Sequence, residues 1–220
     1  MDYAKYIDHT LLKAEAQTKD IDKLIREAKE HGFKTVCVNS SWVKYCAEKL
    51  KGLDVGITSV VGFPLGAMIT QAKAHEAKLA IDHGGTEIDM VMNIGRMKEK
   101  TYEYVLNDIK AVKKAVGDHV LKVIIETALL TEQETKKATE LVLESGADFV
   151  KTSTGFSFRG ASQEDVIIMK EVVGDKIGIK AAGGVKTLAD LKKMIELGAT
   201  RIGTSSGVKL ISGKEVGKSY

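Results

Sequence analysis

The 220-residue sequence predicts an α/β protein that folds as a single-domain (β/α)8 barrel, a TIM barrel, over residues 1–220. First, a helix end, a glycine and an apolar run follow one another at four places, at intervals of 52, 62 and 52 residues, or about two βα units each time. These glycines are Gly32, Gly84, Gly146 and Gly198. Second, Gly52, Gly117 and Gly174 end the intervening helices, so seven helix-to-strand joints imply eight strands. Third, the strands are rich in Val and Ile, which is typical of parallel strands buried on both faces.

The apolar runs place the predicted strands, in chain order, at Tyr6–His9, Lys34–Asn39, Gly56–Gly62, Glu87–Asn93, Val120–Glu126, Asp148–Ser153, Gly178–Ala181 and Arg201–Thr204. Segments with helical periodicity lie between them, most clearly Asp20–His31, Gln71–His83, Tyr102–Val116 and Thr131–Ser145. A doubly wound open sheet is the alternative, but it normally has fewer strands and a glycine fingerprint after the first one. Residues 8–13 at that position read Asp-His-Thr-Leu-Leu-Lys and contain no glycine.

The composition excludes several classes of function. The net charge of +3 is mild, and the lysines are mixed with acidic residues on predicted helices, which fits solvated helix faces better than nucleic-acid binding. No stretch approaches the roughly 20 apolar residues of a membrane span, and the N-terminus lacks the apolar region of a signal peptide. Cys37 and Cys46 lack a metal-type spacing and the histidines form no short-spaced cluster, so we expect a cytoplasmic protein without a metal.

Two lysines close apolar strands and are candidates for a reactive pair. Lys151 ends the run that begins at Phe149, and Lys180 ends a second run that begins at Ile177. Burial lowers the pKa of an ammonium group from about 10.4, and a neighbouring cation lowers it further. The resulting neutral amine is a nucleophile that condenses with carbonyl groups. The alternative is that each lysine extends from its strand end into solvent, but the occurrence at two strand ends favours the reactive pair.

A barrel of this kind has its active site at the carboxyl ends of its strands. The polar residues predicted there are Asp8, Asn39, Asp89, Asn93, Glu126, Lys151 and Lys180. Alternation along the fourth strand places Asp89 on the same face as Glu87 and opposite Ile88. A carboxylate is costly to bury unless it is paired or used, so Asp89 is a candidate catalytic residue, with a structural salt bridge to Lys122 as the alternative. Asp8 is a second candidate, and it could equally cap the loop that follows it.

Glycine loops follow the seventh and eighth predicted strands, where this fold commonly binds phosphate. Glycines let backbone N–H groups converge on an anion. The candidate phosphate-binding residues are Gly155, Gly183, Gly184, Gly203, Ser205 and Ser206. Arg159 is a further candidate, because a guanidinium makes bidentate contacts with phosphate, and a solvent-facing loop arginine is the alternative.

Five segments resemble the deoxyribose-phosphate aldolase family, and the likeness runs from residue 6 to the C-terminus. They are residues 8–13 (DHTLLK), 87–93 (EIDMVMN), 121–127 (LKVIIET), 149–157 (FVKTSTGFS) and 179–187 (IKAAGGVKT). The resemblance implies a class I aldolase that cleaves 2-deoxy-D-ribose 5-phosphate to D-glyceraldehyde 3-phosphate and acetaldehyde, without a metal or other cofactor. It further implies that Lys151 is the Schiff-base lysine, that Lys180 is the neighbouring cation, and that Asp89 relays protons through water.

The resemblance also bears on residues outside these three. Cys37 matches a family cysteine near the site, although a small buried hydrophobic residue is an equally good interpretation. Tyr220 ends a tail over about residues 212–220 that we expect to be flexible, and some family members carry a terminal tyrosine that assists proton transfer at the acetaldehyde carbon. The chain departs from the family at Phe158 and Arg159, where most bacterial members have small residues, and this departure concerns the loop after the sixth strand.

Two competing functions remain open from the residues alone. A pyridoxal-phosphate enzyme also needs a Schiff-base lysine and a glycine-lined phosphate site, and a non-catalytic sugar-phosphate sensor needs only passive lysines. We expect a small-molecule sugar phosphate as partner, with no nucleic acid and no membrane. The sequence leaves the oligomeric state open, a homodimer included, because an apolar dimer face looks like core.

Overall fold

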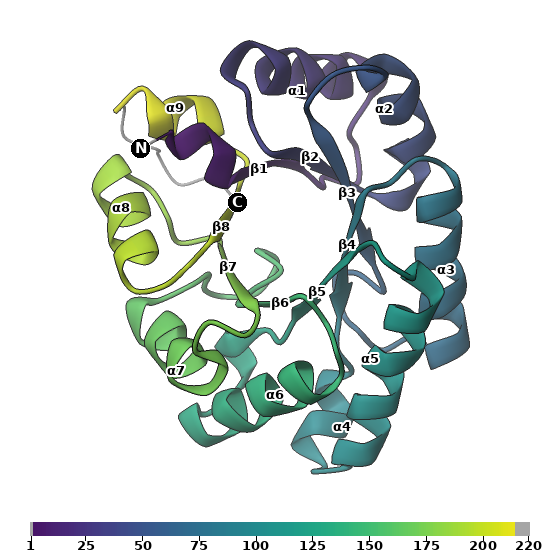
Figure 1. Ribbon diagram of the computed structural model, residues 1–220, viewed down its shortest axis with the longest axis vertical. Coiled ribbons are helices and arrows are strands. Elements are labelled where there is room, and N and C mark those ends of the chain that lie inside the picture. The colour runs from purple at the N-terminus through teal and green to yellow at the C-terminus, as the bar shows by residue number, and fades with distance from the viewer. Residues whose placement is uncertain (1, 214–220) are drawn as a thin grey trace.

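Eight parallel strands close into a barrel in chain order, and the helices surround it (Figure 1). The computed structural model describes residues 2–213 of the chain. The strands are β1 (Ile7–Leu11), β2 (Thr35–Val38), β3 (Gly56–Val61), β4 (Glu87–Val91), β5 (Val120–Ile124), β6 (Phe149–Lys151), β7 (Gly178–Ala182) and β8 (Arg201–Thr204). Strand β8 pairs with β1 in parallel, which closes the barrel. The predicted (β/α)8 architecture is therefore confirmed.

The helices that follow the strands are α1 (Thr18–His31), α2 (Val43–Leu50), α3 (Thr70–Asp82), α4 (Ile94–Lys98), α5 (Tyr102–Val116), α6 (Glu132–Glu144), α7 (Gln163–Val173), α8 (Leu188–Glu196) and α9 (Gly207–Ile211). Short 3-10 helices lie at Tyr3–Tyr6, Ser40–Trp42 and Thr127–Leu129. None of the helices within residues 2–213 combines the length and the apolar character that crossing a bilayer requires.

The ends of the elements differ from the predicted ends by at most two residues, and the differences have local causes. Strand β4 stops at Val91 because Asn93 caps α4, where its side chain accepts a hydrogen bond from the N–H of Arg96. Strand β5 stops at Ile124 because Glu126 adopts a left-handed backbone conformation with a φ of 53°. Both interruptions turn the chain into a loop at the carboxyl end of the barrel, where the sequence predicts the site.

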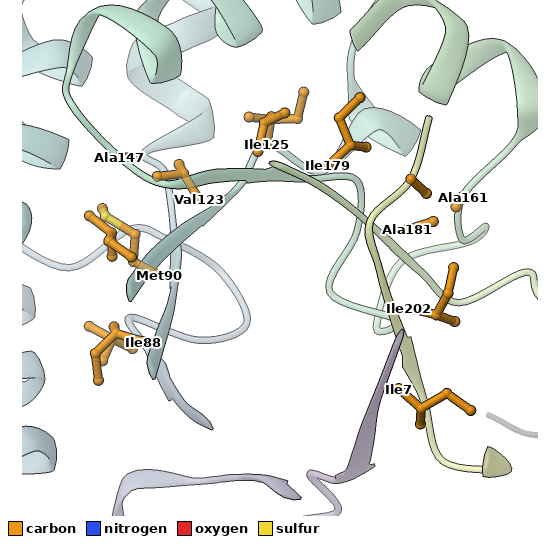
Figure 2. Close-up of a cluster of buried hydrophobic side chains, with 14 of the residues drawn as sticks. Ile7, Ile88, Met90, Val123, Ile125, Ala147, Ala161, Ile179, Ala181 and Ile202 are labelled. Carbon is orange, nitrogen blue, oxygen red and sulfur yellow. The ribbon is translucent and has the colours of Figure 1, made fainter. Parts of the chain in front are cut away.

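The main core lies between the barrel and the surrounding helices. Figure 2 shows side chains such as Ile88, Met90, Val123 and Ile202 extending outward from their strands. Alternation then turns their sequence neighbours toward the barrel axis, and Glu87 is among these inward residues. The two-faced pattern predicted for β4 is thus confirmed. The interior of the barrel is filled largely by charged side chains, which is the feature that determines the site.

Candidate active site

Strand register brings the two predicted lysines to the same level of the barrel. Lys151 on β6 is the register partner of Lys180 on β7, and Asp89 on β4 is the register partner of Lys122 on β5. The Nζ atoms of Lys151 and Lys180 both donate to Oδ2 of Asp89, at 2.8 Å and 2.7 Å. All of these side chains are buried. The three residues predicted to carry the chemistry therefore form one contiguous group.

Asp8 belongs to the same group. Its Oδ2 accepts a hydrogen bond from Nζ of Lys180 at 2.5 Å, and its Oδ1 accepts one from the hydroxyl of Thr35 at 2.9 Å. The guanidinium of Arg201 also donates to Oδ1, at 2.7 Å. Asp8 thus pairs with the cation beside Lys151, and the alternative of a loop cap does not describe these contacts.

A second layer of charges lies on the far side of Asp89 from Lys151. Lys122 lies 2.8 Å from Oδ1 of Asp89 and 2.5 Å from Oε2 of Glu87. Arg201 donates to both carboxylate oxygens of Glu87, at 2.8 Å and 3.2 Å. The salt bridge between Asp89 and Lys122 that the sequence offered as an alternative is present, and it coexists with the contacts to the other two lysines.

Sequence reasoning did not identify Glu87 and Arg201 as site residues. The available signal was alternation, because a carboxylate two residues before Asp89 must share its inward face. For Arg201, which begins β8, the signal was absent, since only closure of the barrel brings it against β1 and Glu87.

The two neighbouring lysines titrate differently. Burial lowers the pKa of Lys151, and the positive charge of Lys180 lowers it further, although Asp89 opposes the change. Burial acts on Lys180 in the same sense, but the carboxylates of Asp8 and Asp89 outweigh it and raise the pKa of Lys180 above its ordinary value. Of the two lysines, Lys151 therefore loses its proton more readily, while Lys180 is held in its charged form beside it.

Asp89 is held as a carboxylate. Burial alone would raise its pKa, but the ammonium groups of Lys122, Lys151 and Lys180 hold it well below its usual range. Glu126, which follows β5, behaves in the opposite way, because burial raises its pKa despite hydrogen bonds from Thr154. Oε2 of Glu126 accepts from the backbone N–H and the hydroxyl of Thr154, and so fixes the loop that follows Lys151.

Cys37 is buried, as its interpretation as a small hydrophobic residue requires, and its role near the site stays a prediction. Its side chain is fully buried in a small apolar cluster with Leu12, Val60 and the partly buried Phe63. Burial raises the pKa of its thiol, and the charge of Lys180 partly offsets that rise. A buried thiol whose pKa is raised behaves as a small apolar side chain rather than as a nucleophile.

Four of the six predicted glycine and serine residues of the phosphate site line two cavities at the mouth of the barrel. One, of about 720 Å³, includes Gly155 and Ser205 in its wall, and the other, of about 510 Å³, includes Gly155, Gly183 and Gly184. Gly203 lies inside β8, where an added Cβ would be 3.0 Å from Cε of Lys180, so its lack of a side chain leaves room for that lysine. The backbone N–H of Ser206 donates to the hydroxyl of Thr204.

Arg159 has partners within the protein. Its guanidinium donates to Asp165 at 2.6 Å and 3.1 Å and to the backbone oxygens of Thr127 and Gly160. Asp165 also lies in the capping box of α7, so this pairing fixes the loop to the start of the helix. The predicted phosphate contact stays a prediction, and it would require the guanidinium to give up part of this pairing.

Two other predicted residues, Asn39 and Asn93, do not join the charged group. Asn39 donates to the backbone oxygen of Leu12, and Asn93 caps α4. Tyr220 lies outside the described residues. Over residues 2–213, no group of three or more His, Cys, Asp or Glu side chains is arranged to hold a metal ion.

A parallel barrel with a buried lysine of lowered pKa, which shares a carboxylate with a second lysine, fits an aldolase that works through a lysine Schiff base. The chain belongs to the DeoC/LacD aldolase family, because a family model described as DeoC/LacD family aldolase matches residues 3–215. A deoxyribose-phosphate aldolase from Mycoplasmopsis pulmonis is 66% identical over 220 residues, covering 100% of both chains.

Solved structures of relatives have the same fold. The crystal structure of a putative deoxyribose-phosphate aldolase from Coccidioides immitis is 45% identical with a TM-score of 0.94, over 96% of this chain and 85% of that one. A deoxyribose phosphate aldolase from Aeropyrum pernix, described as having a unique tetrameric structure, is 32% identical with a TM-score of 0.86, over 96% of this chain and 89% of that one.

Proposed function

We propose that this protein is a class I aldolase that reversibly cleaves 2-deoxy-D-ribose 5-phosphate to D-glyceraldehyde 3-phosphate and acetaldehyde, with Lys151 as the Schiff-base lysine. The observation that carries the proposal is the environment of Lys151, whose Nζ lies 2.8 Å from Asp89 Oδ2 and beside a second, permanently charged lysine. Relatives named deoxyribose-phosphate aldolase that match the whole chain support the choice of substrate.

The reaction begins at the neutral amine. Nζ of Lys151 attacks the C1 aldehyde of the open-chain sugar, and loss of water from the adduct leaves a protonated imine. Asp89 stabilises this new cation, because its carboxylate already lies at hydrogen-bond distance from the nitrogen. Burial lowers the pKa of Lys151, and the charge of Lys180 lowers it further, so both favour the neutral amine in the free enzyme.

The protonated imine then draws electrons from the C2–C3 bond of the sugar. The proton of the C3 hydroxyl leaves to Asp89 through water, the C2–C3 bond breaks, and D-glyceraldehyde 3-phosphate departs from an enamine on Lys151. The ammonium groups of Lys122 and Lys180 favour the ionised form of Asp89, so a proton that it accepts passes on readily, which suits a relay. Protonation of the enamine at C2 and hydrolysis of the imine release acetaldehyde and restore the amine.

The phosphate group would bind at the mouth, in the loops that contain Gly155, Gly183, Gly184 and Ser205. Gly183 and Gly184 have φ values of 68° and 74°, in the left-handed region that residues with side chains rarely adopt. This conformation lets successive backbone N–H groups turn toward an anion. The carboxylate of Glu126 supports this arrangement from below by fixing Thr154. Gly203 and Ser206 would act indirectly, by making room for Lys180 and by shaping the loop after β8.

Tyr220 remains a proposed proton carrier for the acetaldehyde carbon. A phenol with a pKa near 10 can exchange protons when it is held close to the lysine pair. Deletion of Tyr220 should slow exchange of the acetaldehyde methyl protons with solvent, while trapping at Lys151 stays unchanged. Exchange at the wild-type rate would remove Tyr220 from the mechanism.

The remaining features of the proposal concern cofactors, compartment and assembly. The chemistry above uses only amines, carboxylates and water, so no metal or other cofactor is required. Cys37 and Cys46 are both free thiols, which fits a reducing cytoplasm. One chain is proposed to form one domain, and light scattering on the purified protein would distinguish a homodimer from a tetramer like that described for the relative from Aeropyrum pernix.

A cleavage assay tests the proposal. Purified protein is incubated with 2-deoxy-D-ribose 5-phosphate, with and without a chelator, and both aldehyde products are quantified. We expect equal amounts of the two aldehydes, no effect of the chelator, and no product with Lys151→Ala, whose fold is checked by circular dichroism. Inhibition by the chelator would instead indicate a metal-dependent aldolase, and a yellow protein that loses activity on dialysis would indicate pyridoxal phosphate.

A further inference from the structure

The charges inside the barrel form one connected cluster. Every member contacts at least one group of opposite sign, and all are buried, with at most 6% of any residue exposed. The cations are Lys122, Lys151, Lys180 and Arg201, and the carboxylates are Asp8, Glu87 and Asp89. Four cations therefore face three carboxylates, and the cluster becomes neutral when one cation loses its proton.

The structure determines which cation that is. Arg201 keeps its proton, because a guanidinium stays charged at any pH at which the protein folds. Lys122 contacts Glu87 at 2.5 Å and Asp89 at 2.8 Å, and Lys180 contacts Asp8 at 2.5 Å and Asp89 at 2.7 Å. Lys151 has a single carboxylate partner, Asp89, which it shares with both other lysines. Of the three lysines, Lys151 therefore has the fewest carboxylate contacts to stabilise its protonated form.

Glu87 and Arg201 occupy matching positions around Lys151. The barrel order runs from β4 through β5, β6 and β7 to β8, so Glu87 and Arg201 come from strands that are each two places from β6. With strands about 4.8 Å apart, each lies on the order of 10 Å from Lys151. Neither appears among the contacts of Lys151, and they pair with each other through two hydrogen bonds.

We propose that Glu87 and Arg201 are positioning residues that fix the charge balance of the cluster, and that this balance makes Lys151 its one neutral amine. The proposal rests on the proposed Schiff-base function. Glu87 acts through Lys122 and Asp89, and Arg201 acts through Asp8 and Lys180. Each also acts on Lys151 directly through the buried, weakly screened interior.

The two residues should act with opposite signs. Loss of the negative charge of Glu87 makes a proton on Lys151 less favourable, so more of the amine is neutral at a given pH. Loss of the positive charge of Arg201 makes that proton more favourable. Neither variant replaces any other ionisable group near Lys151. These groups are Asp8, Cys37, Asp89, Lys122, Glu126 and Lys180.

The test uses Glu87→Gln, Arg201→Met, the double variant and Arg201→Lys. The readout is the pH dependence of the rate at which acetaldehyde and a borohydride reagent modify Lys151, located by peptide mass spectrometry. A unit charge at about 10 Å and an effective dielectric constant of about 20 predicts a shift of about one pH unit, which is a tenfold change in rate below the pKa.

We expect the profile of Glu87→Gln to move to lower pH and that of Arg201→Met to move to higher pH. The double variant should return close to the wild-type profile, and Arg201→Lys, which keeps the charge, should leave it in place. If the ion pair between Glu87 and Arg201 were merely structural, the pH profiles of both single variants would shift in the same direction, or not at all, because each substitution breaks the same contact. Either result in folded variants overturns the proposal.

Folding is followed by thermal melting, because removal of one partner leaves a buried charge. If Arg201→Met does not fold, the pH profile of Glu87→Gln alone tests the proposal, since glutamine keeps the shape of glutamate and one acceptor oxygen. An unshifted profile in that variant refutes the proposal. Failure of the proposed function is a separate result: the wild-type protein would then form no adduct at Lys151 at any pH.

Discussion

Replacement of Lys180 by methionine tests how the site makes a neutral amine. Methionine is also unbranched and fills part of the same volume, but it carries no charge. The Nζ atoms of Lys151 and Lys180 both contact Oδ2 of Asp89, at 2.8 Å and 2.7 Å, so they lie within about 5.5 Å of each other. At an effective dielectric constant of about 20, two charges at this distance repel by about 3 kcal/mol, equivalent to about 2 pKa units.

The sign follows from the charge that is lost. Without Lys180, the Asp89 carboxylate also has one cation fewer to share, and this change favours protonation of Lys151 as well. The pKa of Lys151 should rise by about 1 to 2 units. The pH profile for Schiff-base formation should then move to higher pH, and the rate at neutral pH should fall at least tenfold.

The assay measures the rate of reductive trapping of acetaldehyde on Lys151 between mildly acidic and alkaline pH. Trapping is preferable to turnover, because loss of Lys180 also affects later steps. Lys180→Arg is the matched control, since it keeps a charge beside Asp89 and should shift the profile much less. A profile for Lys180→Met that coincides with wild type, in a protein that melts cooperatively, would refute the reasoning that the two lysines interact.

Three further predictions concern packing and substrate binding. Gly184→Ala should lower the free energy of unfolding by at least twice the roughly 1 kcal/mol expected for Gly174→Ala. Both glycines have positive φ, but only at Gly184 would a Cβ lie 2.5 Å from a neighbouring backbone oxygen. Similar denaturant midpoints for the two variants would contradict this. Lys73→Met should lower the free energy of unfolding in urea by about 3–5 kcal/mol, because it leaves Asp108 buried without the partner at 2.7 Å. Lys78→Met, which removes an exposed ion pair with Asp82, should lower it by under about 1 kcal/mol. Equal losses would show that burial does not determine the strength of these pairs. Arg159→Ala should raise KM for 2-deoxy-D-ribose 5-phosphate more than for free deoxyribose, and equal changes would restrict Arg159 to its pairing with Asp165.

Much of the fold could be predicted from the sequence because the signals are local. Glycines such as Gly32 and Gly174 end helices in backbone conformations that other residues disfavour, and Val-rich runs between them read as buried strands. The strand that ends at Lys151 was recognisable for the same reason. The last two residues of several predicted strands were assigned wrongly. The cap of Asn93 on the N–H of Arg96 is local and was missed, whereas Glu126, which adopts a left-handed conformation, has its partner Thr154 in a distant part of the chain.

The candidate site was only partly predictable, because its contacts are long-range. Lys151, Lys180 and Asp89 stood out as costly charges in apolar strands. The pairing of Asp8 with Lys180 joins residues 172 positions apart, and it follows from barrel closure rather than from any local pattern. The catalytic and salt-bridge interpretations of Asp89 were posed as alternatives, but its carboxylate contacts Lys122 through one oxygen and the two predicted catalytic lysines through the other, which a sequence cannot reveal.

The central claim is that Lys151 forms the covalent intermediate, and chemical trapping tests it most directly. The wild-type protein is treated with acetaldehyde and borohydride, digested and mapped by mass spectrometry, with Lys151→Ala as the matched control. We predict a single ethyl group on Lys151 in the wild type and none in the variant, with Lys180 unmodified in both. An adduct on Lys180, or none on Lys151 in a protein that still cleaves the sugar phosphate, would contradict the claim.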